Sequence, residues 1–174
     1  MNENNDFQNG QLSNNSLAFI ALCNEYCAAV ENAADYDAAG LTDEMLRLLP
    51  RIYISATDIK ADFMTGEGGY IAPSLDEDTY DRLRATMSAV MGEDDTFLEV
   101  FVEDMKYSDT PIASSVSESL ADLFQVFYDF LETCREAPND LINEALAGVR
   151  ESFADYWSQT LVNVLRALNA LKFN

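Results

Sequence analysis

Seven residues in the second half of the chain have side chains that could bind a ligand. Five belong to one acidic stretch and two lie near the carboxyl end: Glu99, Glu103, Asp104, Tyr107, Asp109, Trp157 and Arg166. On a helix, Glu99 and Glu103 would be one turn apart, so their carboxylates would share a face. Carboxylates and a tyrosine at a bend between two helices could bind a small molecule or a divalent cation. The alternative interpretation is a solvated helix face with a capped corner.

Arg166 lies in a polar strip beside the apolar residues of the last predicted helix. If other helices cover this strip, the guanidinium needs an acidic partner. We therefore predict that Arg166 pairs with Asp104 or Asp109 and ties the last helix to the acidic stretch. A ligand site here would be lined by four residues: Glu103, Asp104, Tyr107 and Trp157.

Several catalytic chemistries lack their usual residues in this sequence. There is no histidine, which removes the commonest general base and the usual zinc and iron ligands. The acidic pairs are spaced by four, and a di-iron bundle would require a histidine three residues after a glutamate. Cys23, Cys27 and Cys134 do not form a redox motif, and we expect them to be reduced and buried. We predict no catalytic residue, no metal ligand set and no cofactor.

The formal net charge of −21 comes from 31 acidic and 10 basic residues. Such a surface repels phosphate backbones, so we expect no nucleic-acid partner. Anionic membrane surfaces are disfavoured for the same reason. No segment has the length and composition of a membrane span or a secretory signal, and we expect a cytoplasmic protein.

Apolar residues recur at spacings of three and four, which is typical of helices that bury one face. The pattern predicts helices over 15–36, from 42 onward, and over 76–92, 96–107, 111–137 and 140–172. Gly40 should close the first helix and Thr42 should cap the second, in which Pro50 should introduce a kink or a break. Residues 63–75 are predicted to form a loop, either a lid or a packed surface segment.

The 96–107 segment has two local interpretations. Most residues of FLEVFVEDM also suit a strand, but the four-residue spacing from Phe97 to Met105 favours a helix. Asp95 or Thr96 would cap that helix. Asp109 or Thr110 would cap the next helix, with Pro111 in its first turn.

The expected architecture is all-α: one domain, a bundle of about six mostly antiparallel helices over residues 15–174. A polar tail at residues 1–14 should precede the bundle. A chain of 174 residues with 48% hydrophobic residues is long and apolar enough for one sizeable core.

Four strings of this chain resemble one bacterial family, called domain of unknown function 5063. They are NEYC (24–27), LLPRIYI (48–54), EDDTFLEVFVEDMKYSDTPIA (93–113) and YWSQTLVNVLRAL (156–168). The resemblance covers about residues 16–172. It implies a compact all-helical domain from a Bacteroides-like bacterium. It implies no activity, so no catalytic residue is carried over from it.

Two functional hypotheses follow from these residues. The first is a non-enzymatic protein-interaction or adaptor domain, which could also form a homodimer through an exposed aromatic or leucine face. The second is a domain, enzymatic or not, that binds a small molecule or a divalent cation with the carboxylates near the 103–109 bend. The sequence does not identify the protein partner.

Overall fold

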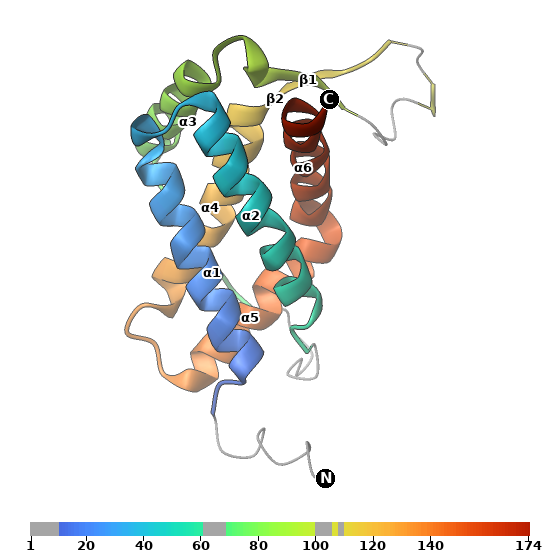
Figure 1. Cartoon of the computed structure of the whole chain (residues 1–174). Helices are drawn as coiled ribbons and strands as arrows, with labels where there is room; N and C mark the ends of the chain where they lie inside the picture. Colours follow the sequence, from blue (N-terminus) through green and yellow to red (C-terminus); the bar gives the residue numbers. More distant parts are fainter. Residues whose placement is uncertain (1–10, 61–68, 100–105, 108–109) are drawn as a thin grey trace.

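Long helices pack lengthwise around an apolar interior and form a bundle (Figure 1). The computed structural model describes residues 11–60, 69–99, 106–107 and 110–174. The helical elements of these residues are α1 (Asn14–Glu31), η2 (Ala33–Asp35), α2 (Ala38–Thr57), α3 (Glu77–Met91), η4 (Gly92–Asp95), α4 (Val116–Cys134), α5 (Asn139–Ser152), η6 (Phe153–Trp157) and α6 (Ser158–Phe173). The all-α prediction is confirmed.

Short polar side chains start four of these helices. Ser13, Asp37, Asp76 and Ser115 each accept a hydrogen bond from an amide in the first turn of α1, α2, α3 and α4, respectively. These bonds satisfy amides that have no partner inside the helix. The predicted helix from Asp76 to Gly92 is confirmed, and Gly92 ends it with a φ of 57°.

The predicted boundary between the first two long helices is wrong. α1 ends at Glu31, and α2 already begins at Ala38. Gly40 lies in the first turn of α2, where its amide donates to the carboxylate of the capping residue Asp37 at 2.7 Å. Thr42 is buried inside the helix rather than capping it. α2 also runs through Pro50 as one helix, so the alternative of two short helices is wrong as well.

The helix predicted over 96–107 is wrong where it begins. Thr96–Leu98 forms strand β1, which pairs antiparallel with β2 (Ala113–Ser115), with Phe97 opposite Ser114. Phe97 is half-buried and its neighbours Thr96 and Leu98 are exposed. This alternation has the two-residue period of a strand, not the four-residue spacing that predicted a helix. The helix predicted from 111 begins only at Val116, because residues 113–115 belong to the hairpin. Residues 100–105 lie outside the described part of the chain.

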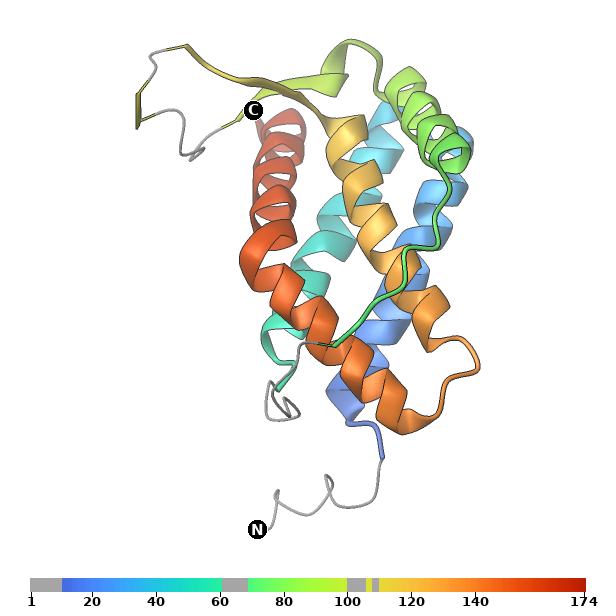
Figure 2. The same cartoon turned by 180° about the vertical axis from the view of Figure 1, so that it is seen from behind.

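The long helix predicted over 140–172 is three elements in succession. α5 passes through the π-helical turn η6 into α6, and the chain bends between α5 and α6 (Figure 2). The Trp157 indole donates to the Val149 carbonyl at 3.0 Å and to the Ser152 hydroxyl at 3.1 Å. A π turn inserts one extra residue into the helix, and here it aims Trp157 into the core.

Residues 69–75 cross the outside of α5 and α4 as an extended strap (Figure 2). The amides of Ser74 and Leu75 donate to Asp129 at 2.9 and 2.8 Å, and the amide of Ala72 donates to Thr133 at 3.1 Å. Residues 69–75 of the predicted 63–75 loop therefore form a packed surface segment, the second of the two predicted alternatives. Residues 61–68 lie outside the described part of the chain.

The core is centred on aromatic side chains from three helices. Phe127 of α4 meets Phe19 and Tyr26 of α1 and Trp157 of η6, each with edge-on ring geometry. All four side chains are fully buried. Tyr26 donates to the Leu120 carbonyl at 2.8 Å, which satisfies the only polar group of these rings besides the Trp157 indole N–H.

Candidate interaction face

The seven residues singled out by the sequence do not share one described pocket. Trp157 is fully buried, whereas Tyr107 is 88% exposed. Glu99 lies at the end of β1, where its amide donates to the Ile112 carbonyl at 2.9 Å. Glu103, Asp104 and Asp109 lie outside the described residues, so a site at the bend stays a prediction.

Arg166 ties α6 to the base of the hairpin. Its guanidinium donates to the backbone carbonyl of Leu98, the last residue of β1. This bond joins α6 to β1 through the backbone. The predicted ion pair with Asp104 or Asp109 concerns residues outside the described part of the chain.

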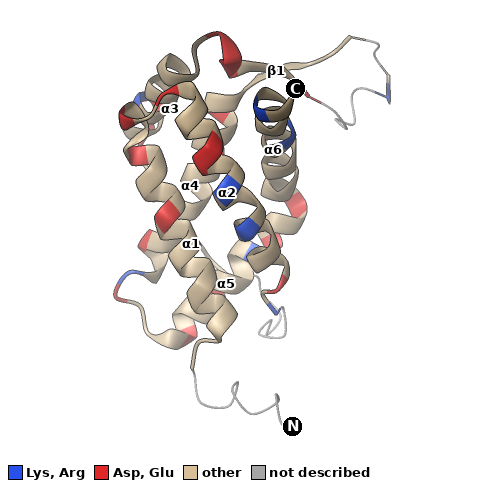
Figure 3. Ribbon diagram, viewed as in Figure 1, with Lys and Arg blue, Asp and Glu red and all other residues tan. Residues whose placement is uncertain are grey.

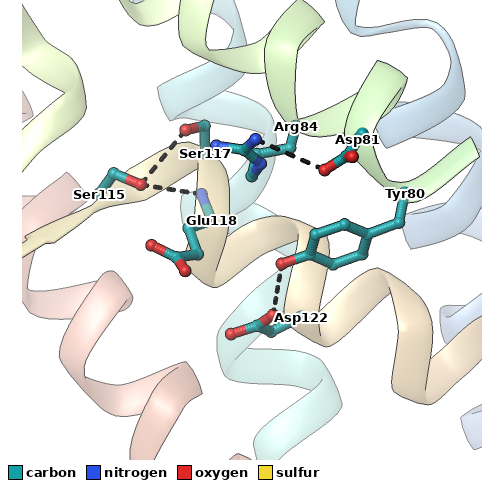
Figure 4. A network of polar contacts seen from close by, with 7 residues as sticks. All are labelled: Tyr80, Asp81, Arg84, Ser115, Ser117, Glu118 and Asp122. Atoms are coloured by element: carbon teal, nitrogen blue, oxygen red, sulfur yellow. Dashed lines mark hydrogen bonds and ion pairs between the residues drawn. The ribbon is translucent and has the colours of Figure 1, made fainter. Parts of the chain in front are cut away.

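Asp122 on α4 joins three elements through two tyrosines, and Figure 4 shows its bond to one of them, Tyr80. Tyr80 of α3 donates to its carboxylate at 2.7 Å, and Tyr156 of η6 donates to it at 3.5 Å. Burial raises the pKa of Tyr80, and the bond to Asp122 adds to the increase. Burial also raises the pKa of Tyr156. Both phenols therefore stay protonated as donors at neutral pH, and this carboxylate serves to hold α3, α4 and η6 together.

The three thiols are protonated, and the prediction that they are buried is wrong for Cys134, which is half-buried at the end of α4. Cys23 and Cys27 are buried on α1, and burial raises the pKa of both. Burial raises the pKa of Cys134 to about 11. Because the thiolate is the nucleophile, none of these cysteines is activated at neutral pH.

The described residues carry neither a metal-binding cluster nor a helix suited to crossing a membrane. They contain no group of three His, Cys, Asp or Glu side chains that could hold a metal ion. Among the described helices, none combines the length and hydrophobicity that crossing a membrane requires.

The feature that sequence reasoning missed is the distribution of charge over α2 and α6. None of the 31 acidic residues falls in residues 45–57 of α2 or residues 158–173 of α6. These two stretches carry four of the ten basic residues: Arg47, Arg51, Arg166 and Lys172. α2 and α6 pack against each other, so the stretches form one surface, here called the acid-free face (Figure 3). The gap in the acidic residues is visible in the sequence, but the pairing of these two helices is not.

A groove runs along the seam between α2 and α6. Its volume is about 580 Å³, and α2 contributes Asp43, Leu46, Arg47 and Pro50 to its lining, while α6 contributes Leu165, Asn169, Lys172 and Phe173. On each helix these positions repeat at spacings of three and four, so one stripe of each helix faces the groove. A second hollow of about 270 Å³ adjoins it at Lys172.

Two of the four cations are already neutralised. Arg47 pairs with Glu44 at 2.6 Å, and Lys172 of α6 pairs with Asp43 of α2 at 2.7 Å. Within the described part of the chain, Arg51 and Arg166 make no ion pair. Among the described residues, the acid-free face therefore has two arginines whose charge no carboxylate neutralises, and one of them, Arg166, donates to the Leu98 carbonyl.

Large apolar side chains are also exposed on this face. They come from both helices, and the most exposed are Phe173 at 70% and Ile54 at 61%: Tyr53, Ile54, Val162, Leu171 and Phe173. The ring of Tyr53 packs on Phe153 with centroids 5.2 Å apart, which fixes it at the edge of the seam. An apolar surface mixed with arginine is typical of protein interfaces.

Comparison with known proteins gives a family and a fold. A family model described as "Domain of unknown function (DUF5063)" matches residues 11–174. The crystal structure of protein BF1032 from Bacteroides fragilis is similar, with a TM-score of 0.76 and 27% sequence identity over 93% of this chain and 94% of that one. No curated protein matches the chain.

Proposed function

Starting from a chain that belongs to the DUF5063 family, whose description assigns no activity, we propose that it is a non-enzymatic protein-interaction domain. The acid-free face is its docking surface. The single observation that carries the proposal is a concentration of exposed apolar side chains and arginines on two stretches of neighbouring helices, 45–57 of α2 and 158–173 of α6, that contain no carboxylate.

The physical argument concerns both affinity and orientation. Burying the exposed apolar side chains of the acid-free face supplies affinity at roughly 25 cal/mol per Å². The arginines of the acid-free face attract the negative charges of a partner, whereas the rest of a protein of net charge −21 repels them. This difference orients the partner as it approaches. The groove provides the concave surface into which an anchor residue could insert.

The protonated thiols, two of them buried, and the absence of histidine support a non-catalytic function. The same three unpaired cysteines support a reducing location such as the cytoplasm.

The proposal is tested with two charge reversals that change the net charge equally. Arg51→Glu alters the acid-free face, and Arg84→Glu is the matched control on α3, where Arg84 pairs with Asp81 at an exposed site. Immobilised wild type and variants are incubated with lysate of the native bacterium, retained proteins are quantified by mass spectrometry, and each candidate is purified and bound again. We expect a protein that wild type and Arg84→Glu retain and that Arg51→Glu loses. Identical retention by all three forms, or no candidate that binds again when pure, would contradict the proposal.

The apolar part of the surface has its own matched pair. Ile54→Gln removes an exposed apolar side chain from the acid-free face, and Leu141→Gln removes one of similar exposure from α5. The partner should bind Ile54→Gln more weakly than wild type and should not distinguish Leu141→Gln from wild type.

A further inference from the structure

We infer that the occupant of the acid-free face is an acidic peptide segment with apolar residues on one side, which docks as a helix along the α2–α6 seam. This inference rests on the proposed function and names the chemistry of the partner. The fold does not depend on this segment, because the core residues are buried without it.

The charges select an acidic segment. Arg51 and Arg166 lie on the two helices that border the seam, and neither makes an ion pair within the described residues. A guanidinium can hold a carboxylate with two parallel hydrogen bonds, which favours arginine sites for acidic partners. Arg47 and Lys172 are held by Glu44 and Asp43, so they shape the groove without adding net charge.

The apolar pattern selects a helix. Leu46, Pro50 and Ile54 follow one another at intervals of four on α2, and Leu165, Asn169 and Phe173 do so on α6. Two parallel stripes of this kind leave a straight groove that an amphipathic helix fills with residues at positions i, i+3, i+4 and i+7. The acid-free stretch of α2, residues 45–57, spans about 20 Å, and the groove occupies its first part, up to Pro50. A docked helix of about four turns would cover the whole stretch.

Pro50 adds a hydrogen-bond acceptor beside the groove. Proline has no amide hydrogen, so the Leu46 carbonyl cannot receive the usual bond from residue 50 of its own helix. Both residues line the groove. A side-chain donor of the docked segment, such as an asparagine or a serine, could bind this carbonyl.

Other occupants fit the charges less well. A second copy of the chain docked through the same face would bring together, from each copy, two arginines that make no ion pair within the described residues. A basic segment would meet the same cations. An anionic membrane would repel the rest of a protein whose net charge is −21.

The test is a selection from a display library of random peptides about 16 residues long, enough for a helix of about 24 Å. Wild-type protein serves as bait, and enriched peptides are synthesised and titrated against wild type, Arg51→Glu and Arg84→Glu. We expect enriched peptides to carry net negative charge and apolar residues at helical spacing. They should bind wild type and Arg84→Glu equally and bind Arg51→Glu at least about tenfold more weakly, which corresponds to about 1.4 kcal/mol. Circular dichroism of all three proteins checks that the variants fold.

Three results would overturn the inference. The first is enrichment of basic or purely apolar peptides; if their binding still depends on Ile54 or Arg51, the proposed function survives without the acidic partner. The second is enrichment of no peptide, or only of peptides that bind Arg51→Glu as well as Arg84→Glu. The third is a different occupant of the face. It would be a second copy, seen as a dimer by sedimentation, or a membrane, seen as cosedimentation with phosphatidylserine-containing vesicles. Either result counts if Arg51→Glu loses the association and Arg84→Glu keeps it.

Discussion

Asp95 caps a helix, as the sequence predicts, but the helix is α4 rather than one that follows Asp95 directly. Its carboxylate accepts the Ser117 amide at 2.7 Å, the Ser117 hydroxyl at 2.8 Å and the Ser88 hydroxyl at 2.9 Å. The sequence indicates that Asp95 or Thr96 caps a helix that begins directly after it. The carboxylate instead binds the first turn of α4, more than twenty residues later, because β1 and β2 bring the two segments together.

Replacing Asp95 with alanine should lower the free energy of unfolding by about 2–3 kcal/mol. The change removes hydrogen bonds to a charged acceptor and leaves an amide at the start of α4 without its cap. Asp94→Ala is the control, since Asp94 is exposed and we expect a change within about 0.5 kcal/mol. Urea unfolding of both variants gives the comparison, and equal losses would show that Asp95 is not a specific anchor.

The thiols predict a loss of stability in alkaline solution. Burial raises the pKa of Cys134 from its ordinary value of 9.0 to about 11, and burial also raises the pKa of Cys23 and Cys27. Below pH 9 these groups are protonated in both states, so their contribution is complete. Above it the unfolded chain releases protons that the folded chain retains, and stability falls as pH rises.

The measurement is the urea midpoint as a function of pH. Cys134→Ala should flatten the decline between pH 9 and about 11, the window that its pKa shift defines. A midpoint that rises with pH in this window, or a variant with an unchanged slope, would contradict this assignment.

At the scale of elements, local signals located most helices and misplaced the hairpin. Asp76 and Gly92 mark the ends of α3 because both act within their own turn. β1 is held by hydrogen bonds to β2, in which Ser114 lies seventeen positions after its partner Phe97. The strand therefore depends on a segment that lies outside the local periodicity. The strap over α4 and α5 has the same origin, since its partners Asp129 and Thr133 lie far along the chain.

Gly148 tests the packing of the strap on α5. Glycine inside a helix costs about 1 kcal/mol relative to alanine, so propensity alone predicts that Gly148→Ala stabilises the protein. A Cβ at this position would collide with the carbonyl oxygen of Gly69 and lie 3.0 Å from its carbonyl carbon. We therefore expect a loss of about 1–3 kcal/mol, typical of overpacking.

The control for this variant is Gly40→Ala in α2. Its Cβ would meet only the side chains of Tyr36 and Asp37, at 3.1 Å or more, and these can adjust. Thermal unfolding of both variants distinguishes the two sites. A stabilised Gly148→Ala would mean that residues 69–75 do not press on α5.

At the scale of the whole molecule, composition predicted an acidic helical protein but not where its charge would be absent. The stretches 45–57 and 158–173 are separated by about a hundred residues, and only the packing of α2 against α6 makes them one surface. Acidic residues are spread over the other helices, whereas 45–57 and 158–173 contain basic residues and no acidic ones (Figure 3). No single residue of that face is unusual, so residue types and spacing alone point to the acidic bend instead.

Amide hydrogen exchange of the protein, free and bound to the partner or peptide that the selections identify, tests the central claim most directly. The account predicts that binding slows exchange in residues 45–57 of α2 and 158–173 of α6 and leaves α3 and α5 unchanged. Protection confined to the β1–β2 hairpin or to the α3–α4 surface, with α2 and α6 unaffected, would contradict it.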